Sequence, residues 1–161
     1  MEQELEIREH EGGVSAEGKR FAVIVSKFNF SITKKLLDGA IECFKKNGAG
    51  NTTEIDVYYC PGAFELPQIA SFVLQHKQYH AVVCLGAVIR GETPHFDYIC
   101  QECARGIGSA SQTFGVPIMF GVLTTNTYEQ AEERAGGSVG NKGFDAALAA
   151  ITMANLYSQI S

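Results

Sequence analysis

The sequence has no apolar run of about 18 residues and no excess of basic side chains. Without such a run, no segment is long enough to cross a membrane as an apolar helix. The 13 Lys and Arg residues are outnumbered by 18 Asp and Glu residues, which gives a formal net charge of −5. Because nucleic-acid-binding proteins carry basic surfaces, we expect neither a nucleic acid nor a membrane as partner. An anionic ligand would have to be held by a few local donors.

Sequence motifs for nucleotide binding are also absent, since the chain contains no GxGxxG and no Walker sequence. The five cysteines include one pair, Cys100 and Cys103, with thioredoxin-type CxxC spacing. The pair falls within a predicted helix, and no second pair completes a zinc site, so we expect no bound metal. An odd cysteine count and an acidic first segment unlike a signal peptide favour a cytoplasmic protein.

What is present is the composition of a globular domain. Of the 161 residues, 45% are hydrophobic and 19% are charged. The first segment is polar, so we predict an N-terminal arm over residues 1–18 and a single domain over residues 19–161.

Apolar runs rich in β-branched residues alternate with segments of helical periodicity. Ser31 is the predicted N-cap of the first helix and Gly48 its stop, while Thr127 and Gln130 have capping-box spacing. Pro67 is tolerated only in the first turn of the second helix. Strands are predicted at 20–28, 54–60, 81–89 and 117–123, and helices at 31–48, after the turn at 61–65, and at 95–113, 127–136 and 144–159.

This alternation predicts an α/β fold, a three-layer α/β/α sandwich around a four-stranded parallel sheet. Ligands of such folds bind beyond the carboxyl ends of the strands. The segments 27–29, 60–65, 90–95 and 120–127 are therefore expected at one rim of the sheet.

The loop after the third strand, "RGETPH", has the residues of a phosphate site. Gly91 lets the backbone approach a ligand, Thr93 adds a hydroxyl, and the N–H groups at the start of the next helix attract anions. Glu92 would contribute its N–H with its carboxylate turned away, and His95 is placed to relay protons. The alternative is an ordinary helix start, with Thr93 as cap and His95 as a surface residue.

The segment "CPGAFELP" places an aromatic ring and a carboxylate at the end of the second strand. Phe64 could stack on a heterocycle and Glu65 could accept its N–H groups. The alternative is that Phe64 belongs to the core and that Glu65 is a helix-terminal charge. Phe28 is open to the same alternative, and Asn29 to the role of a turn residue.

Two cations flank the glycine-rich link between the last two helices. Arg134 and Lys142 are natural partners for a phosphate, although cations at solvated helix ends are common.

Together these segments resemble the 6,7-dimethyl-8-ribityllumazine synthase family of riboflavin biosynthesis. The resemblance lies in "KFNFSIT", "PGAFELP", "LGAVIRGETPHFDYI", "FGVLTTNTYEQAEERAG" and "GNKG". It covers the chain from about Arg20 to its end. It implies a flavodoxin-like fold and the condensation of 5-amino-6-(D-ribitylamino)uracil with 3,4-dihydroxy-2-butanone 4-phosphate. The product is 6,7-dimethyl-8-ribityllumazine, with release of phosphate and water, and no cofactor is used.

The resemblance also implies a role for each candidate residue. His95 would transfer protons. Phosphate would be held by Gly91, Glu92, Thr93 and Arg134, with Asn29 and Lys142 as auxiliary residues. The aminouracil would be bound by Phe28, Ala63, Phe64, Glu65, Ala87, Val88, Ile89 and Phe120.

In the family, Phe120, Arg134 and Lys142 come from a neighbouring subunit, so a monomer would hold only half a site. The subunits of the family form pentamers, and the resemblance therefore implies a homopentamer. The short link "GGSVGNKG" resembles the members in which pentamers assemble into an icosahedral capsid of sixty subunits, able to encapsulate riboflavin synthase. The arm would then add a strand to the sheet of a neighbouring subunit.

Two positions depart from the family pattern, because Lys27 stands where many members have arginine and Glu132 replaces a commonly apolar residue. Three other interpretations stay open: a non-catalytic flavodoxin-like ligand-binding protein, a capsid-forming container, and a thiol oxidoreductase that uses Cys100 or Cys103.

Overall fold

The computed structural model describes Met1 and residues 3–161. Its centre is a parallel sheet of four strands, β1 (Arg20–Ser26), β2 (Glu54–Cys60), β3 (Ala81–Ile89) and β4 (Ile118–Thr125). Their order in the sheet is β2-β1-β3-β4. β2 and β3 have the predicted bounds, whereas β1 ends at Ser26, before the predicted Phe28. The predicted α/β class and four-stranded parallel sheet are confirmed.

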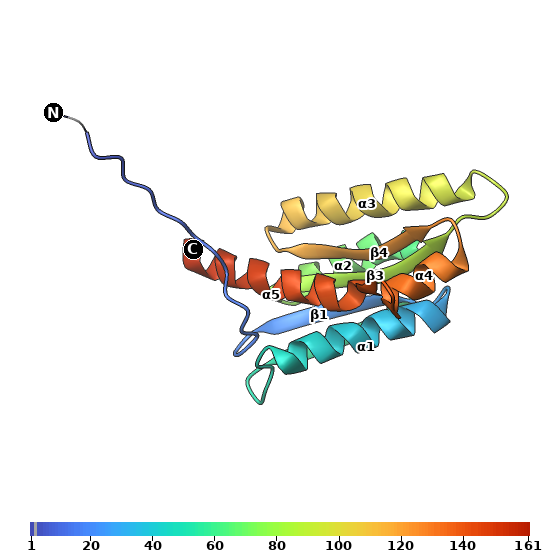
Figure 1. Ribbon diagram of the computed structural model, residues 1–161, viewed down its shortest axis with the longest axis horizontal. Helices are drawn as coiled ribbons and strands as arrows, with labels where there is room; N and C mark the ends of the chain where they lie inside the picture. Colours follow the sequence, from blue (N-terminus) through green and yellow to red (C-terminus); the bar gives the residue numbers. More distant parts are fainter. Residues whose placement is uncertain (2) are drawn as a thin grey trace.

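Helices cover both faces of the sheet, as the predicted sandwich requires (Figure 1). α1 and α5 pack on one face, and α2 and α3 pack on the other. A short helix, α4, follows β4. The bounds are α1 (Phe30–Lys46), α2 (Leu66–His76), α3 (His95–Phe114), α4 (Tyr128–Arg134) and α5 (Lys142–Ile160).

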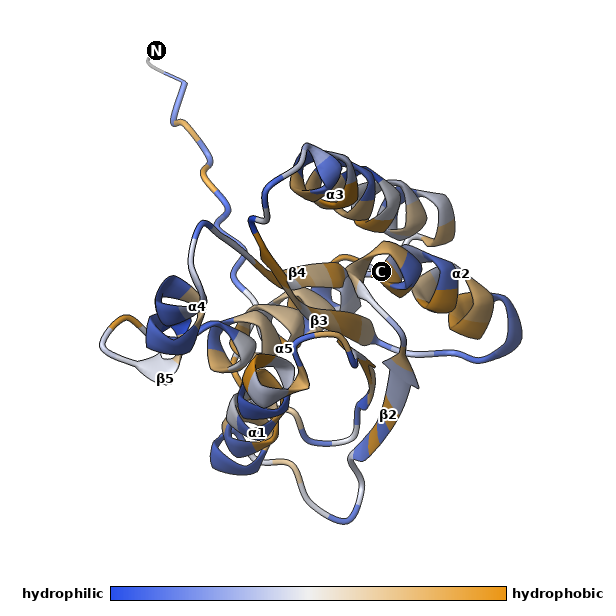
Figure 2. Cartoon of the chain, turned by 90° about the vertical axis from the view of Figure 1, so that its right-hand side faces the viewer, coloured by the Kyte–Doolittle hydropathy of each residue, from blue (hydrophilic) through white to orange (hydrophobic). Residues whose placement is uncertain are grey.

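Alternate side chains of the strands enter two different cores. In β1, Phe21, Val23 and Val25 pack with α1 and α5, while Ala22 and Ile24 pack with α2 and α3. The cause is the two-residue period of a strand, which turns successive side chains to opposite faces. All five side chains are fully buried. The apolar sheet therefore lies inside the helical layers, whose outer faces are more hydrophilic (Figure 2).

The close approach of α1 and α5 depends on a glycine in the first turn of α5. A Cβ atom added to Gly143 would lie 1.9 Å from the carbonyl oxygen of Leu36, which is inside van der Waals contact. A Cβ atom added to Gly39 of α1 would lie 2.3 Å from Oδ1 of Asn141, the residue before α5. The first turn of α5 therefore meets the backbone of α1 at Leu36, and the side chain of Asn141 fills the space beside Gly39.

The first helix begins differently from the prediction. Asn29 takes a left-handed conformation (φ 59) before α1, so Ser31 is not the N-cap. Ser31 lies within the first turn instead, and its hydroxyl is 2.8 Å from that of Tyr128. The stop was predicted correctly, because the helix ends at Lys46 and Gly48 follows with a positive φ of 84.

Other helix starts follow the sequence pattern. Pro67 lies in the first turn of α2. Thr127 and Gln130 form the predicted reciprocal capping box of α4. A small hairpin that was not predicted, β5 (Ala135–Gly137) and β6 (Gly140–Asn141), then joins α4 to α5.

The segment before β1 is extended and lies partly on α5. Residues 3–19 form no helix or strand. The side-chain amide of Asn155 donates to the carbonyl oxygens of Gly13 (2.7 Å) and Ser15 (3.0 Å), and that of Gln159 donates to Glu11 (2.9 Å). Residues 3–10 extend away from the body of the molecule (Figure 1). In the described part of the chain, no helix combines the length and apolarity that a bilayer crossing needs.

Candidate functional site

A cavity of about 620 Å³ lies at the carboxyl ends of β1, β2 and β3. This is the place that parallel α/β sheets use for ligands. Most of the predicted site residues line it, together with Pro61 and Gly62 of the segment 60–65 expected at this rim, and with Phe96 and Ile99, which were not predicted. The predicted residues in this cavity are Phe28, Ala63, Phe64, Glu65, Ala87, Val88, Ile89, Gly91, Thr93 and His95.

Phe28 reaches the cavity because β1 stops just before it. Its backbone N–H donates to the carbonyl oxygen of Pro61 at 2.8 Å, which fixes the chain beside the end of β2. The ring is 72% exposed, so the alternative that Phe28 is a core residue is wrong. Asn29 does not line the cavity; its side-chain amide donates to the carbonyl oxygen of Ala87 at 2.9 Å. Asn29 therefore ties the loop after β1 to the end of β3.

Lys27, the residue before Phe28, has a structural role between two aromatic rings. Its ammonium group lies 4.5 Å from the ring centroid of Phe30 and 4.9 Å from that of Tyr59. Cation–π contacts of this kind hold the start of α1 against the end of β2. A lysine in place of the family's arginine therefore keeps a charge that the surrounding rings can hold.

The second segment of the site is a single turn of 3-10 helix, Ala63–Glu65, in front of α2. Phe64 is 43% exposed on the cavity, so it is not a core residue either. Ala63 is buried and small, which leaves room at the wall. An exposed ring and the half-buried Glu65 carboxylate are the groups that would stack on and hydrogen-bond a polar heterocycle.

The third segment is the loop between β3 and α3. Gly91 has open space around its Cα, and Thr93 and His95 expose their side chains toward the cavity. α3 starts at His95 after Pro94, and no side chain caps it. The alternative in which Thr93 caps the helix is therefore wrong. The free N–H groups at the start of a 20-residue helix favour an anion here. Glu92 is exposed and does not line the cavity.

Three predicted residues lie elsewhere. Phe120, Arg134 and Lys142 line a second cavity of about 450 Å³, formed by β4, α4 and α5. The two cavities have no lining residue in common. Arg134 donates from Nη1 to the carbonyl oxygen of Gln130 (3.0 Å), and the same atom lies 3.6 Å from a Glu133 carboxylate oxygen. One chain thus carries an aromatic cavity and, separately, a cationic one.

The cysteines are poor candidates for thiol chemistry. Burial raises the pKa of Cys60 to about 11 and that of Cys103 to about 12, and it also raises the pKa of Cys100. Since the thiolate is the reactive form, all three environments oppose redox chemistry at neutral pH. In the residues that the structure describes, no three His, Cys, Asp or Glu side chains are grouped as metal ligands.

Sequence reasoning missed part of the cavity wall. Phe96 and Ile99 follow His95 on α3 and face the same cavity. Ile99 follows His95 by four residues and Phe96 by three, and residues at these spacings lie on one face of a helix. Helical periodicity could therefore have identified Ile99. Phe96 gave no separate signal in the sequence.

The fold and the cavities point to a class: small α/β proteins with a ligand cavity at the carboxyl ends of parallel strands. The family model for 6,7-dimethyl-8-ribityllumazine synthase matches residues 18–158. The chain belongs to this family.

Curated relatives support the same assignment over nearly the whole chain. The 6,7-dimethyl-8-ribityllumazine synthase of Chlorobium phaeovibrioides is 56% identical over 153 residues, which is 95% of this chain and 98% of the relative. The enzyme of Desulfatibacillum aliphaticivorans is 53% identical over 149 residues, which is 92% of this chain and 96% of the relative. The enzyme of Chlorobaculum tepidum is 51% identical over 156 residues, which is 97% of this chain and 100% of the relative.

Proposed function

We propose that this protein condenses 5-amino-6-(D-ribitylamino)uracil with 3,4-dihydroxy-2-butanone 4-phosphate. The product is 6,7-dimethyl-8-ribityllumazine, and phosphate and water are released in this penultimate step of riboflavin biosynthesis. The observation that carries the proposal is that ten residues expected from three separate segments line one cavity. The family membership agrees with it. Imine formation, elimination and ring closure need two oriented reactants, neutralised phosphate and proton transfer, which side chains alone can supply.

The aminouracil is assigned to the aromatic end of the cavity. The exposed ring of Phe28 is placed to stack on the pyrimidine. Glu65 would accept hydrogen bonds from the ribityl chain or ring, beside Ala63 and Phe64. The strand end Ala87–Ile89 would present backbone groups to the uracil edge. The carbonyl oxygen of Ala87 already accepts from Asn29, and β3 is paired with β4 as far as Ile89, so the groups left for a ligand are those that face away from β4.

The butanone phosphate is assigned to the loop before α3. N–H groups of Gly91, Glu92 and Thr93 would hold the phosphate at a helix start that carries partial positive charge. His95, at the first position of that helix, would move protons between the amine, the ketone and the leaving groups. Arg134 would pair with the phosphate, with Lys142 as a second cation.

The separation of the two cavities supports a site that is shared between subunits. Phe120, Arg134 and Lys142 would complete the aromatic cavity of a neighbouring copy, which makes the protein an obligate oligomer. A homopentamer satisfies this arrangement, and the icosahedral assembly of sixty subunits would place pentamers together. Encapsulated riboflavin synthase is the proposed protein partner, and the cytoplasm is the proposed location.

The arm over residues 1–18 is proposed to join neighbouring subunits, while residues 19–161 form the single domain. Leu5 and Ile7 alternate with charged residues and are 82% and 71% exposed, so they bury no apolar surface within their own chain. Alternation of this type suits a strand added to the edge of another sheet.

The experiment that tests the proposed function is a paired assay of lumazine absorbance and phosphate release. Wild-type protein should form both in equal amounts, faster than the uncatalysed condensation. Arg134→Ala should lose most of the acceleration because the phosphate loses its cation. Lys46→Ala, on α1 outside both cavities, is the control and should keep full activity. No acceleration by folded, assembled protein would reject the enzyme and favour a binding protein or container.

A further inference from the structure

Arg90 is the first residue after β3, and it makes contacts in three directions. Its backbone N–H donates to the carbonyl oxygen of Thr125 (2.9 Å), and its Nε donates to Oδ1 of Asn126 (3.0 Å), so it is joined to the end of β4. Its Nη1 lies 3.5 Å from Oδ1 of Asp97 in the first turn of α3. Its guanidinium carbon lies 4.4 Å from the ring centroid of Phe96.

These contacts keep the guanidinium away from the proposed phosphate position. Ile89 and Gly91 line the aromatic cavity on either side of Arg90, but Arg90 itself does not line it. Its planar face is covered by Phe96, and its donors point to an amide and a carboxylate. The cation nearest in sequence to the phosphate-binding loop is therefore committed to protein contacts.

The structure around this arginine explains why the loop needs it. No side chain caps the start of α3, so a local capping hydrogen bond does not fix where the helix begins. A Cβ atom added to Gly91 would have no atom within 4 Å, so no neighbouring side chain packs on that side of the loop. Arg90 supplies links from β4 to two residues of the first turn, Phe96 and Asp97. Phe96 also forms part of the cavity wall, next to His95.

We propose that Arg90 is a positioning residue: it holds the loop Gly91–Pro94 and the first turn of α3 against β4, without binding substrate itself. The inference rests on the proposed function, because it assigns the phosphate to that loop. An arginine suits this role better than a lysine, since its planar group can stack on a ring and donate in two directions at once.

The test compares steady-state kinetics of Arg90→Ala, Arg90→Lys, Asn126→Ala and Asn126→Asp with wild type. For Arg90→Ala we expect the KM of the butanone phosphate to rise about tenfold or more, with a smaller change for the aminouracil, because a displaced loop misplaces its donors. Arg90→Lys should not restore the wild-type value. Lys46→Ala removes an ion pair and a cation–π contact at the other end of α1, and should leave both KM values unchanged.

Asn126 distinguishes positioning from direct phosphate binding, because its side chain lines neither cavity and its Oδ1 accepts from Arg90. If Arg90 acts by position, Asn126→Ala raises the same KM, Asn126→Asp keeps the acceptor and restores it, and Asn126→Ala adds little to Arg90→Ala, which already removes that hydrogen bond. If Asn126→Ala behaves as wild type while Arg90→Ala loses phosphate affinity, Arg90 binds the phosphate directly and the proposal is overturned.

A second readout separates this inference from the proposed function. The affinity for inorganic phosphate is measured by calorimetry on the assembled wild type and on the same variants. Weaker phosphate binding in both Arg90→Ala and Asn126→Ala supports the positioning role, even if wild-type protein forms no lumazine. Unchanged phosphate binding and unchanged KM values in both variants, in an active enzyme, would overturn the role of Arg90 and leave the proposed function standing.

Discussion

His95 lies at the first position of α3 with its side chain on the aromatic cavity. From this place it can reach a ligand held by the loop that precedes it. If it transfers protons, His95→Gln should lower kcat by about 100-fold while changing both KM values much less. Steady-state kinetics with each substrate varied in turn measure this. A variant with wild-type kcat would remove His95 from the mechanism and return it to the role of a surface residue.

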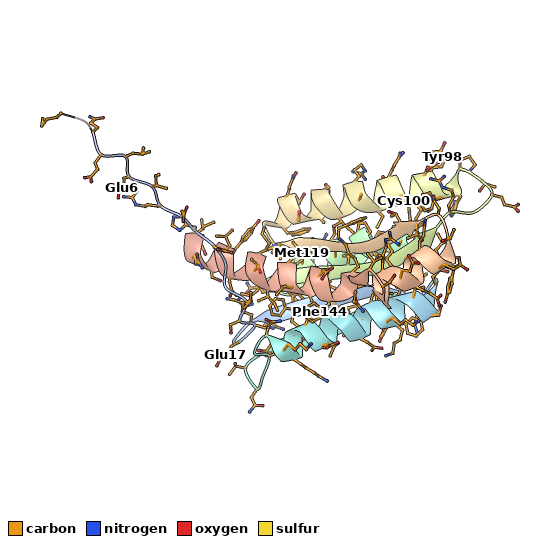
Figure 3. All side chains as sticks on the ribbon, in the orientation of Figure 1. Glu6, Glu17, Tyr98, Cys100, Met119 and Phe144 are labelled. Atoms are coloured by element: carbon orange, nitrogen blue, oxygen red, sulfur yellow. The ribbon has the colours of Figure 1, made fainter. Side chains whose placement is uncertain are left out.

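The thiols give a second test at the scale of single residues. Cys100 is partly exposed near the start of α3 (Figure 3), whereas Cys60 and Cys103 are buried. At pH 7, alkylation by iodoacetamide should modify Cys100 first and leave the other two unmodified in the native protein. Mass spectrometry of the labelled chain gives the order. Rapid modification of Cys103 at neutral pH would instead support the thiol oxidoreductase.

The raised pKa values of the thiols also determine how the stability of the folded protein changes with pH. Because the folded protein holds the protons of Cys60 (about 11) and Cys103 (about 12) more tightly than the unfolded chain, the unfolded chain loses them first as the pH rises above about 9. These two thiols therefore contribute stability that is fully present below about pH 9 and is lost as the pH rises to about 11 for Cys60 and about 12 for Cys103.

At the scale of elements, α1 and α5 approach each other through Gly143. Gly143→Ala would place a methyl group on the carbonyl of Leu36, so the unfolding free energy should fall by about 1–3 kcal/mol. Gly108→Ala is the matched control. Gly108 is also a helical glycine, but a Cβ atom there would meet open space. The free energy of unfolding of this variant should rise by about 1 kcal/mol. Urea unfolding followed by circular dichroism measures both. Equal effects at the two positions would contradict the close packing.

The elements were predictable where one local signal decides the structure. The apolar runs of β2 and β3 and the capping box of α4 follow from the sequence, since strand burial and capping depend on nearby residue types. The start of α1 was predicted wrongly because Asn29 takes a left-handed conformation while its side chain donates to Ala87 of β3. A contact between distant segments has no local signature.

The candidate site was likewise predictable from the sequence only in part. The loop at Gly91–Pro94 has residue types that are typical of anion sites, and Gly91 and Thr93 line the cavity at the expected rim. The contacts of Arg90 with Asn126 and Asp97 could not be predicted, because they join the ends of β4 and α3. The roles of Ala87, Val88 and Ile89 came from the family resemblance rather than from any property of their side chains.

At the scale of the whole molecule, the arm provides a test of assembly. Deleting residues 1–10 removes Leu5 and Ile7 but keeps the segment that Asn155 and Gln159 hold on α5. The domain should keep its melting temperature at low concentration, while the assembly dissociates to smaller species because the added strand is lost. Analytical ultracentrifugation of both chains shows this. An unchanged assembly would show that the arm joins no subunits.

The central claim is that each active site is built from two chains, with the aromatic cavity of one and the cationic cavity of the next. The measurement is complementation: His95→Ala and Arg134→Ala chains are mixed, unfolded and reassembled together. Each variant alone should be nearly inactive. In an equal mixture about a quarter of the sites receive two intact halves from neighbouring chains, so about a quarter of wild-type activity should return. A mixture as inactive as its components would contradict the shared site and place both residues in one chain's own site.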